Sequence, residues 1–391
     1  MRFLIISPTP THPVSAGNCM RIVNLIHALQ ELGHDVHFLH VTYTQGEPDA
    51  MRACWGKNFH EYHYRKPWQK YHWHGIPIPD RISRKILNFG WLHQRIDQMY
   101  DHGLDDHLLA LQEEHSFDAV MVEYVFFSAA LNVFPETVHK LIDTHDVYTD
   151  RHLMLSQNNM RVEWFFTIES EERKGLKRAH TVLAIQDEEN RKLRQILKHS
   201  RPVFTVGHFL PPSPQAPPSQ LKTLMIIGSG NSLNIRYFQE FIDNCWNPIF
   251  SKHPELRLKI VGSVCQNLKR TPGVELLGFV EKIEQTYADS DLVINPLLTG
   301  TGLKIKSLEA ISYGRALLTT PIGLEGLEDA DGKCAMLATT FKEMAQAIEQ
   351  LLSTPQRLSA MSQAAAEYAG QYQTKQIQAL QTALERQPRS A

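Results

Sequence analysis

Short apolar runs alternate along the chain with segments in which apolar residues recur at helical spacing. The runs predict buried β-strands at 2–7, 36–41, 118–122, 140–142, 181–185, 202–206, 221–227, 256–262, 274–280, 292–297 and 316–320. Helical spacing predicts helices at 20–32, 84–100, 104–115, 162–179, 188–197, 304–313 and from 341 onward. Strands that alternate with helices form parallel sheets with helices on both faces. The pattern therefore predicts the α/β class, with doubly wound, Rossmann-like domains.

A proline-rich segment divides this pattern into two halves. Between Pro211 and Pro218 five of eight residues are proline, which makes a stiff linker rather than a core element. The chain has 391 residues, 42% hydrophobic and 21% charged, a composition that can bury two cores. We place an N-terminal domain at 1–202 and a C-terminal domain at 203–370, with a terminal helix at about 371–391.

Composition and charge exclude several classes of protein. The formal net charge is −2, so nothing marks the whole chain as a nucleic-acid binder. The five cysteines lie far apart, with no C-x-x-C pair, so neither a disulfide framework nor a zinc site is indicated. The apolar run Phe3–Ile6 is too short for a signal peptide, and no run approaches about 18 apolar residues, the length of a membrane span. We expect a soluble cytoplasmic protein that does not bind nucleic acid.

The stretch Leu292–Leu327 carries the clearest chemical signal. It reads as a strand, a loop with two glycines and two threonines, a helix and a further strand. A glycine loop at a helix N-terminus attracts phosphate, because free N–H groups and the helix dipole point at it. Lys304 in the first turn adds a positive charge, and Glu309 follows about 7.5 Å further along the helix axis. This spacing suits a lysine on the diphosphate and a carboxylate on the ribose of one nucleotide.

The segment GTGLKIKSLEAISYGRALLTTPIGLEGL, at 300–327, resembles the donor-binding segment of bacterial family 4 retaining glycosyltransferases, which have the GT-B fold. The resemblance implies two doubly wound domains that face a cleft, a nucleotide-sugar donor in that cleft, and no required metal or other cofactor. Many members of the family carry an acidic residue that touches the donor sugar where this chain has Thr301. The family also implies that the terminal helix packs back on the first domain. Carried over residue by residue, the resemblance implies donor contacts from Thr301, Gly302, Leu303, Lys304 and Glu309.

Further positions match the family's donor and reaction site. In IDTHD, at 142–146, His145 matches a histidine that lies near the reacting sugar carbon. Gly17 matches a glycine loop that lies against the donor diphosphate. In the second domain the matching donor-binding residues are Gly228, Ser229, Asn234, the weaker candidate Arg236, and Val280 at the end of a strand that meets the nucleobase.

Several of these matches have a structural alternative. Gly17 can equally be a loop glycine that needs positive φ. Asp143 and Asp146 can be N-caps of a following helix. His145 can hydrogen-bond a donor hydroxyl or help to deprotonate the acceptor, since imidazole titrates near neutral pH. The D-x-D at 289–291 matches a structural turn of the family rather than a metal motif.

Residues 59–81, FHEYHYRKPWQKYHWHGIPIPDR, are rich in histidine, aromatic residues and cations. The H-x-x-H and H-x-H spacings of His60, His63, His72 and His74 fit no standard zinc pattern, so we expect no metal site. Tyrosine, tryptophan, lysine and arginine together suit an acceptor surface or an anionic membrane. A solvated insertion that packs its own aromatic rings is the simpler interpretation.

The sequence therefore predicts a retaining, hexosyl-type enzyme that transfers a sugar from a nucleotide-diphosphate sugar to an acceptor hydroxyl. We expect a glycan, a lipid-linked molecule or a protein as the acceptor. We also expect a role in cell-surface polysaccharide or glycoconjugate synthesis and peripheral contact with the inner membrane. A sugar-nucleotide epimerase of the same fold and a non-catalytic sugar-nucleotide-binding subunit are the alternatives. A nicotinamide enzyme is remote, because no full G-x-G-x-x-G is present.

Overall fold

The structure is a computed structural model of residues 1–391. It describes residues 1–14, 17–65, 72–73, 76–77, 93–153, 165–300 and 302–385. Thr301, most of 66–92 and the start of the helix expected at 162–179 lie outside the described residues. The chain forms two compact units: unit 1 consists of residues 1–208 and 377–391, and unit 2 consists of residues 209–376.

Unit 1 is built on a parallel sheet of seven strands in the order β3-β2-β1-β6-β7-β8-β9. The strands are β1 (Arg2–Ser7), β2 (Asp35–Val41), β3 (Phe59–Tyr62), β6 (Ala119–Glu123), β7 (His139–Asp143), β8 (Thr181–Ala184) and β9 (Val203–Thr205). The helices are α1 (Gly17–Glu31), α2 (Pro48–Trp55), α4 (Leu104–His115), α6 (Glu169–Leu176) and α7 (Asp187–Ile196), with the 3₁₀ segments η1 (Gly56–Asn58) and η2 (Val125–Val133). A separate antiparallel pair joins β4 (His72–Trp73) and β5 (Ile76–Pro77).

Unit 2 repeats this plan with a parallel sheet of six strands in the order β12-β11-β10-β13-β14-β15. The strands are β10 (Thr223–Ile227), β11 (Arg257–Val261), β12 (Val274–Gly278), β13 (Leu292–Asn295), β14 (Ala316–Thr319) and β15 (Ala335–Leu337). The helices are α8 (Ser232–Phe241), the π-helical turn η3 (Ile242–Trp246), α9 (Asn247–Lys252), α10 (Ile283–Ala288), α11 (Ile305–Ser312), α12 (Phe341–Ser353) and α13 (Pro355–Glu385). Short 3₁₀ turns lie at Ser263–Asn267, Ile322–Leu324 and Glu328–Ala330.

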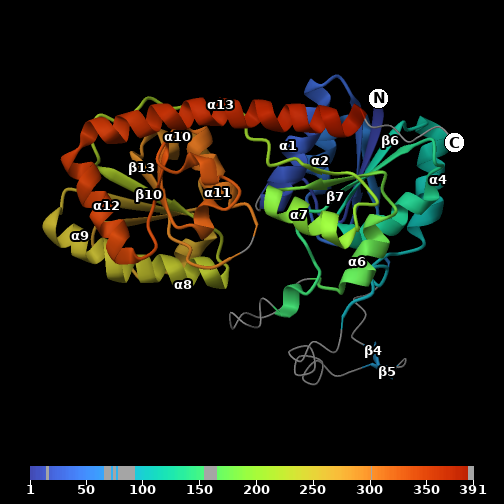
Figure 1. Ribbon diagram of the computed structural model, residues 1–391, viewed down its shortest axis with the longest axis horizontal. Helices are drawn as coiled ribbons and strands as arrows, with labels where there is room; N and C mark the ends of the chain where they lie inside the picture. The colour runs from blue at the N-terminus through green and yellow to red at the C-terminus, as the bar shows by residue number, and fades with distance from the viewer. Residues whose placement is uncertain are drawn as a thin grey trace. The chain divides into compact units, whose positions relative to one another are not determined.

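Both sheets are covered by helices on two faces (Figure 1). In unit 1 the apolar side chains of α4, η2, α6 and α7 share one core cluster with one face of the sheet, and α1 buries its apolar stripe on the other face. In unit 2 α8, η3, α9 and α12 share such a cluster, whereas α11 buries a separate set of residues. Inner strands such as β1, β6, β13 and β14 are mostly apolar and buried on both faces, as expected for parallel sheets. The predicted α/β class with doubly wound, Rossmann-like units is confirmed.

The strand order places a topological switch point in each unit. In unit 1 the chain proceeds from β1 outward to β3 and then returns to β6 on the other side of β1. In unit 2 it proceeds from β10 outward to β12 and returns to β13 on the other side of β10. Open α/β sheets bind ligands at the carboxyl ends of the two strands that flank such a point. The loops after β1, β6, β10 and β13 are therefore the first places to look for a site.

Two predicted helices differ from the structure. Residues 93–100, the described part of the helix predicted at 84–100, form turns, and the helix predicted at 162–179 is confined to Glu169–Leu176. The reason is a tertiary contact between the two segments. The backbone N–H of Gln94 donates to the carbonyl of Phe166, and the N–H of Phe166 donates to the Gln94 side chain. Thr167 also forms a β-bridge with Thr149, so pairing replaces helix at this point.

The segment between the units is ordered rather than a free linker. The N–H groups of Ser213 and Gln215 donate to the carbonyls of Ser312 and Tyr313, at the end of α11. At the other end of unit 2, α13 continues past residue 376 into the part of the chain that clusters with unit 1. The boundary between the units lies after residue 208, whereas the sequence placed it after residue 202.

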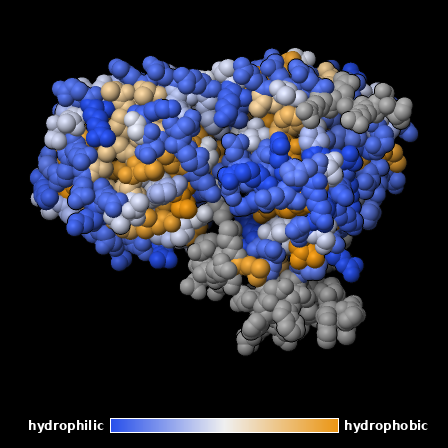
Figure 2. All heavy atoms as spheres, in the orientation of Figure 1, coloured by the Kyte–Doolittle hydropathy of each residue, from blue (hydrophilic) through white to orange (hydrophobic). Residues whose placement is uncertain are grey.

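The surface is mostly polar. On the face drawn in Figure 2, polar residues are spread widely and apolar residues gather in separate groups. Among the residues that the structure describes, no helix is both long enough and apolar enough to cross a membrane.

Candidate active site

The loop after β10 forms a tight turn that brings the donor-binding candidates of unit 2 together. Gly228 donates its N–H to the carbonyl of Val261, and a Cβ at Gly228 would lie 2.8 Å from the Phe238 ring. Only glycine fits there, because real Cβ atoms avoid contacts below about 3 Å. Asn234 is buried, and its side-chain N–H₂ donates to the carbonyl of Ser229 at 2.9 Å. The Asn231 side chain caps α8 by accepting the N–H of Asn234.

The loop after β13 lies beside this turn. The hydroxyls of Tyr237, on α8, and Thr299 are hydrogen-bonded at 3.0 Å. Gly302 has φ of 73°, a left-handed conformation that favours glycine, and its carbonyl accepts from the Lys304 ammonium at 2.5 Å. Lys304 is the N-cap of α11 rather than a residue of its first turn, and its ammonium also lies 3.3 Å from the Glu325 carboxylate. Leu303 is buried below the loop.

A second lysine, Lys306, joins the two loops. Its ammonium donates to the Asn234 side-chain oxygen at 2.9 Å and lies 5.0 Å from the centre of the Phe238 ring. Burial, and then the neighbouring charge of Lys304, lower the pKa of Lys306 to about 7. No carboxylate in the described part of the chain lies within ion-pair distance of Lys306. Two ammonium groups close together are unfavourable unless an anion binds between them.

Glu309 is a buried residue of α11, five positions after Lys304. The Tyr287 hydroxyl donates to its carboxylate at 3.0 Å, and the Tyr287 ring stacks on Tyr313 with centroids 4.3 Å apart. Burial raises the pKa of Glu309 to about 7. The carboxylate is therefore held by a fixed partner, and its second oxygen is the one left to accept from a ribose hydroxyl.

In unit 1, a cluster of ionisable side chains lies where β6 and β7 end. His145 Nε2 lies 2.5 Å from Glu123 Oε2 and 3.6 Å from Asp143 Oδ2. Burial, and then Asp143, raise the pKa of Glu123 to about 7 despite the hydrogen bond to His145. The other ring nitrogen, His145 Nδ1, makes no hydrogen bond within the described ranges. A substrate hydroxyl can therefore use it.

Arg21 neutralises the deepest carboxylate of this cluster. Its guanidinium donates to both oxygens of Asp143, at 2.7 and 2.6 Å, and to the carbonyls of Val206 and Gly207. Both side chains of this pair are at most 1% exposed. Burial alone would raise the pKa of Asp143, but Arg21 outweighs burial and the pKa lies below its usual value. Asp143 is thus part of an ion pair, not the N-cap of a helix.

The backbone around His145 is strained. His145 has φ of 59° and Tyr124 has φ of 69°, values that few non-glycine residues adopt. The two rings stack at 4.1 Å, and the Tyr124 hydroxyl accepts from Asn18 at 3.0 Å. Each such conformation costs about 1–3 kcal/mol and is found mainly at functional sites. The contact through Asn18 also brings the start of α1, where Gly17 lies, to the His145 cluster.

Glu172 of α6 fixes the chain just after this cluster. Its buried carboxylate accepts the N–H groups of Tyr148 and Thr149 at 3.0 and 2.7 Å. Asp146 accepts the N–H of Val147 and pairs with Arg151 at 2.6 Å. Asp146 therefore stabilises a turn, and no helix begins at the residue after it.

Residues 221–354 match the model of the family described as glycosyl transferases group 1. This part of the chain is therefore similar to group 1 glycosyltransferases. The match covers the whole of the turn and loop just described, including Lys304, Lys306 and Glu309. The resemblance drawn from residues 300–327 is confirmed at the level of this group.

Solved glycosyltransferase structures share the fold of the whole chain. The pneumococcal O-GlcNAc transferase GtfA, in complex with UDP and GlcNAc, is 10% identical with a TM-score of 0.65, and 98% of each chain is covered. Anabaena HepE in complex with UDP is 13% identical with a TM-score of 0.67, and 98% of this chain and 100% of that chain are covered. Sucrose-phosphate synthase from Thermosynechococcus elongatus is 14% identical with a TM-score of 0.64, and 98% of each chain is covered. The GT-B fold class is therefore confirmed. No curated protein sequence matches the chain.

Unit 2 brings together most of the residues expected to bind the donor. Lys306 of α11 bonds to Asn234, and the hydroxyls of Tyr237 and Thr299 join α8 to the loop that leads to Gly302. Val280 lies two residues beyond β12, which ends at Gly278 rather than at the predicted 280. The carbonyl of Gly278 accepts the N–H of Gly262 at 2.7 Å, so this strand end lies beside the glycine turn.

Arg236 does not join these residues. It is exposed, and its guanidinium pairs with Glu240 at 2.9 Å and lies over the Tyr237 ring. Sequence reasoning missed Lys306, although the repeated lysine of the segment KIK was a signal. The pattern did indicate Glu123, an acidic residue at the end of a buried strand, as a side chain in the ligand crevice, but it assigned no role to it. Arg21 was missed because its partner lies 122 residues away.

Proposed function

We propose that this protein is a retaining glycosyltransferase that moves a hexosyl unit from a UDP-sugar to an acceptor hydroxyl. One observation carries the proposal: at the switch point of the region that matches group 1 glycosyltransferases, the Lys306 ammonium donates to the Asn234 side chain after β10, and the Lys304 ammonium donates to the Gly302 carbonyl in the loop after β13. The choice of UDP is supported by the solved structures of similar fold that contain it. Retention of configuration rests on the resemblance of residues 300–327.

Unit 2 supplies the charge that transfer requires. When the bond between sugar and diphosphate breaks, negative charge grows on the diphosphate, and fixed positive groups at that position lower the barrier. The ammonium groups of Lys304 and Lys306 and the first N–H groups of α11 are available for this. The donor's ribose hydroxyls bind Glu309. These cations stabilise the leaving group without a metal ion.

In unit 1, His145 is the residue that the resemblance relates to the reacting sugar carbon. We assign His145 to a hydrogen bond with the donor sugar or the attacking hydroxyl through Nδ1, while Glu123 holds Nε2. Gly17 lies close to this point through Asn18 and Tyr124. Acceptors of the proposed reaction are glycans, lipid-linked molecules or proteins, and the setting is cell-surface polysaccharide or glycoconjugate synthesis. Contact with a membrane through residues 59–81 stays a prediction.

Nucleotide binding tests the donor site first. Thermal unfolding is measured with UDP, GDP, ADP and dTDP for the wild type, Lys304→Ala, Glu309→Ala and the control Lys342→Ala, an exposed lysine of α12. At a hundredfold excess over Kd, binding adds about 2.7 kcal/mol of stability, which raises the Tm by about 5 °C or more. UDP is expected to shift the wild type and the control alone. Equal shifts in all four proteins, or no shift with any nucleotide, would overturn the site.

Turnover separates transfer from the other activities of this fold. UDP-glucose and UDP-GlcNAc are incubated with the enzyme and an acceptor extract, and free UDP is measured with time. A transferase releases UDP only when an acceptor is added. An epimerase changes the sugar without releasing UDP, and a binding subunit does neither. UDP binding without UDP release in any extract would therefore contradict the proposed transfer and leave the donor site intact.

A further inference from the structure

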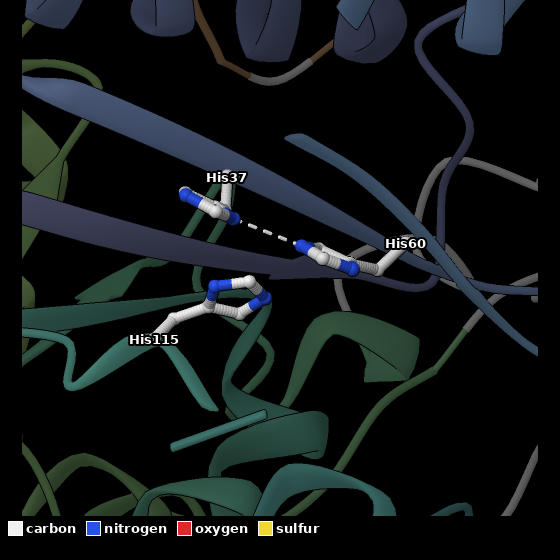
Figure 3. A group of neighbouring side chains, drawn as sticks. All are labelled: His37, His60 and His115. Atoms are coloured by element: carbon white, nitrogen blue, oxygen red, sulfur yellow. Dashed lines mark hydrogen bonds between the residues drawn. The ribbon is translucent and has the colours of Figure 1, made fainter. Parts of the chain in front are cut away.

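Three histidines from different elements meet at the amino end of the unit 1 sheet. His37 lies on β2, His60 lies on β3, and His115 is the last residue of α4. Figure 3 shows the imidazole of His115 directed toward the other two rings. Glu123 and His145 lie at the carboxyl ends of the strands. The three histidines therefore lie at the opposite end of the strands from Glu123 and His145.

The ring nitrogens are close enough to share one metal ion. His37 Nδ1 and His60 Nε2 are 2.9 Å apart, and one nitrogen from each of the three rings lies within 4.8 Å of the others. Zinc binds imidazole nitrogen at about 2.0–2.1 Å in a tetrahedral arrangement, which puts neighbouring nitrogens about 3.3 Å apart. The nitrogens of the three rings are thus at separations comparable to those in a shared coordination sphere.

A carboxylate lies behind one of the rings. Asp35 Oδ2 is 3.7 Å from His37 Nε2, the nitrogen that faces away from His60. A carboxylate behind the second ring nitrogen is the usual outer partner of a metal-binding histidine, because it fixes the tautomer and orients the ring.

The hydrogen bonds within the protein do not account for all three rings. The single bond between His37 and His60 satisfies one nitrogen of each. His115 Nε2 is buried and has no hydrogen-bond partner within the described ranges, which is unusual for a buried polar atom. Arg2 lies close by, since its guanidinium donates to the carbonyl of His115 at 2.5 Å. Its charge opposes a cation, but the Asp35 carboxylate, 3.1 Å away, offsets it.

We propose that His37 through Nδ1, His60 through Nε2 and His115 through one ring nitrogen bind a single divalent transition-metal ion of the zinc class. Three imidazoles select Zn²⁺, Co²⁺, Ni²⁺ or Cu²⁺ over Mg²⁺ or Ca²⁺, which prefer oxygen ligands. The fourth position takes water. The ion ties the edge strand β3 and the end of α4 to β2, so its role is structural. Local spacing along the sequence could not reveal this site, because its ligands lie 23 and 55 residues apart (60 − 37 and 115 − 60).

Metal binding is tested on the full chain, purified without a polyhistidine tag and treated with a chelator. Co²⁺ is titrated and the visible absorption of tetrahedral Co²⁺ is recorded, and Zn²⁺ is titrated by calorimetry. The wild type is expected to bind about one ion per chain and to gain several degrees in Tm with Zn²⁺. His60→Asn and His115→Gln should each weaken binding at least about tenfold, and Asp35→Asn by about 10–100-fold. The control His63→Gln changes an exposed histidine of the same region and should bind as the wild type does.

Absence of the tetrahedral Co²⁺ band, or equal affinity in the wild type, His60→Asn and His115→Gln, would overturn the proposal. If His60→Asn does not fold, His115→Gln at the helix end decides alone, because its ring is partly solvent-accessible. The UDP-induced rise in Tm should be the same in His115→Gln as in the wild type. The metal-site proposal and the donor-site proposal are therefore tested independently of each other.

Discussion

We expect donor binding to depend on pH through Lys306. Substitution of Lys306 should remove this dependence. The pKa of Lys306 is lowered to about 7 in the free protein. A diphosphate beside the ammonium favours its charged form and returns the pKa toward the ordinary value of about 10.4. Binding above pH 7 therefore takes up a proton. Affinity is highest where Lys306 is already protonated and falls as the pH rises.

The magnitude follows from the two pKa values. Between them, the apparent Kd grows as one plus ten to the power of the pH minus about 7. From pH 7.5 to pH 9.0 this factor rises about 25-fold, which corresponds to about 1.9 kcal/mol of binding free energy. The phosphate of UDP has its own pKa near 6 and is ionised throughout this range. The fall in affinity thus reports on the protein.

Calorimetric titration of UDP at several pH values between 7.5 and 9.0 measures this dependence. Lys306→Arg keeps the charge but cannot lose its proton, so it should bind UDP with little change over the range. Lys306→Met should bind more weakly, by about tenfold or more, and should also show little pH dependence. A wild-type affinity that is flat between pH 7.5 and 9.0 would refute the reasoning. So would the same slope in Lys306→Arg, since the titrating group would then lie elsewhere.

Three further substitutions test the unit 1 cluster. His145→Ala should lower kcat by about 10²–10⁴-fold and leave the Kd of UDP within twofold; a large loss of UDP affinity would argue against its assigned place. Wild-type turnover should fall as the pH drops through about 7, where Glu123 takes up its proton, and the pH–rate profile of Glu123→Gln should lack this limb. Arg21→Met should lower the free energy of unfolding by about 3–5 kcal/mol, because it leaves Asp143 as an unpaired buried charge. Urea unfolding measures this loss, and a change below about 1 kcal/mol would mean that the pair is not as buried as described.

Strand periodicity predicted the sheet elements well because parallel strands are apolar on both faces. The run at 316–320 corresponds to β14 at Ala316–Thr319, and the helix predicted at 104–115 is α4. The prediction failed where tertiary pairing overrode local propensity. Phe166 lies in a segment of helical spacing, yet its N–H and carbonyl pair with Gln94. No local pattern encodes that contact.

The candidate site was predictable only in part, for a related reason. The glycine loop and Lys304 are adjacent in sequence, so their chemistry could be inferred from one segment. Lys306 acquires its role from Asn234, which is 72 residues away. The resemblance suggested Arg236 as a weaker donor-binding candidate, but its place on the helix directs it to Glu240. The direction of each side chain on its helix therefore explains why Lys306 contacts Asn234 and Arg236 does not.

The charges of the two candidate clusters differ in a way that matches their proposed ligands. In unit 1 the Asp143 carboxylate is paired with Arg21, and one oxygen of Glu123 is hydrogen-bonded to His145. Such groups suit neutral sugar hydroxyls, which offer and accept hydrogen bonds. In unit 2 the Lys304 ammonium pairs with the Glu325 carboxylate, and no carboxylate of the described residues lies within ion-pair distance of Lys306. That excess of positive charge lies at the switch point, where it would be unfavourable in the free protein unless an anion binds. Each unit, taken alone, therefore carries side chains that suit its proposed ligand. These ligands are neutral sugar hydroxyls for unit 1 and an anionic diphosphate for unit 2.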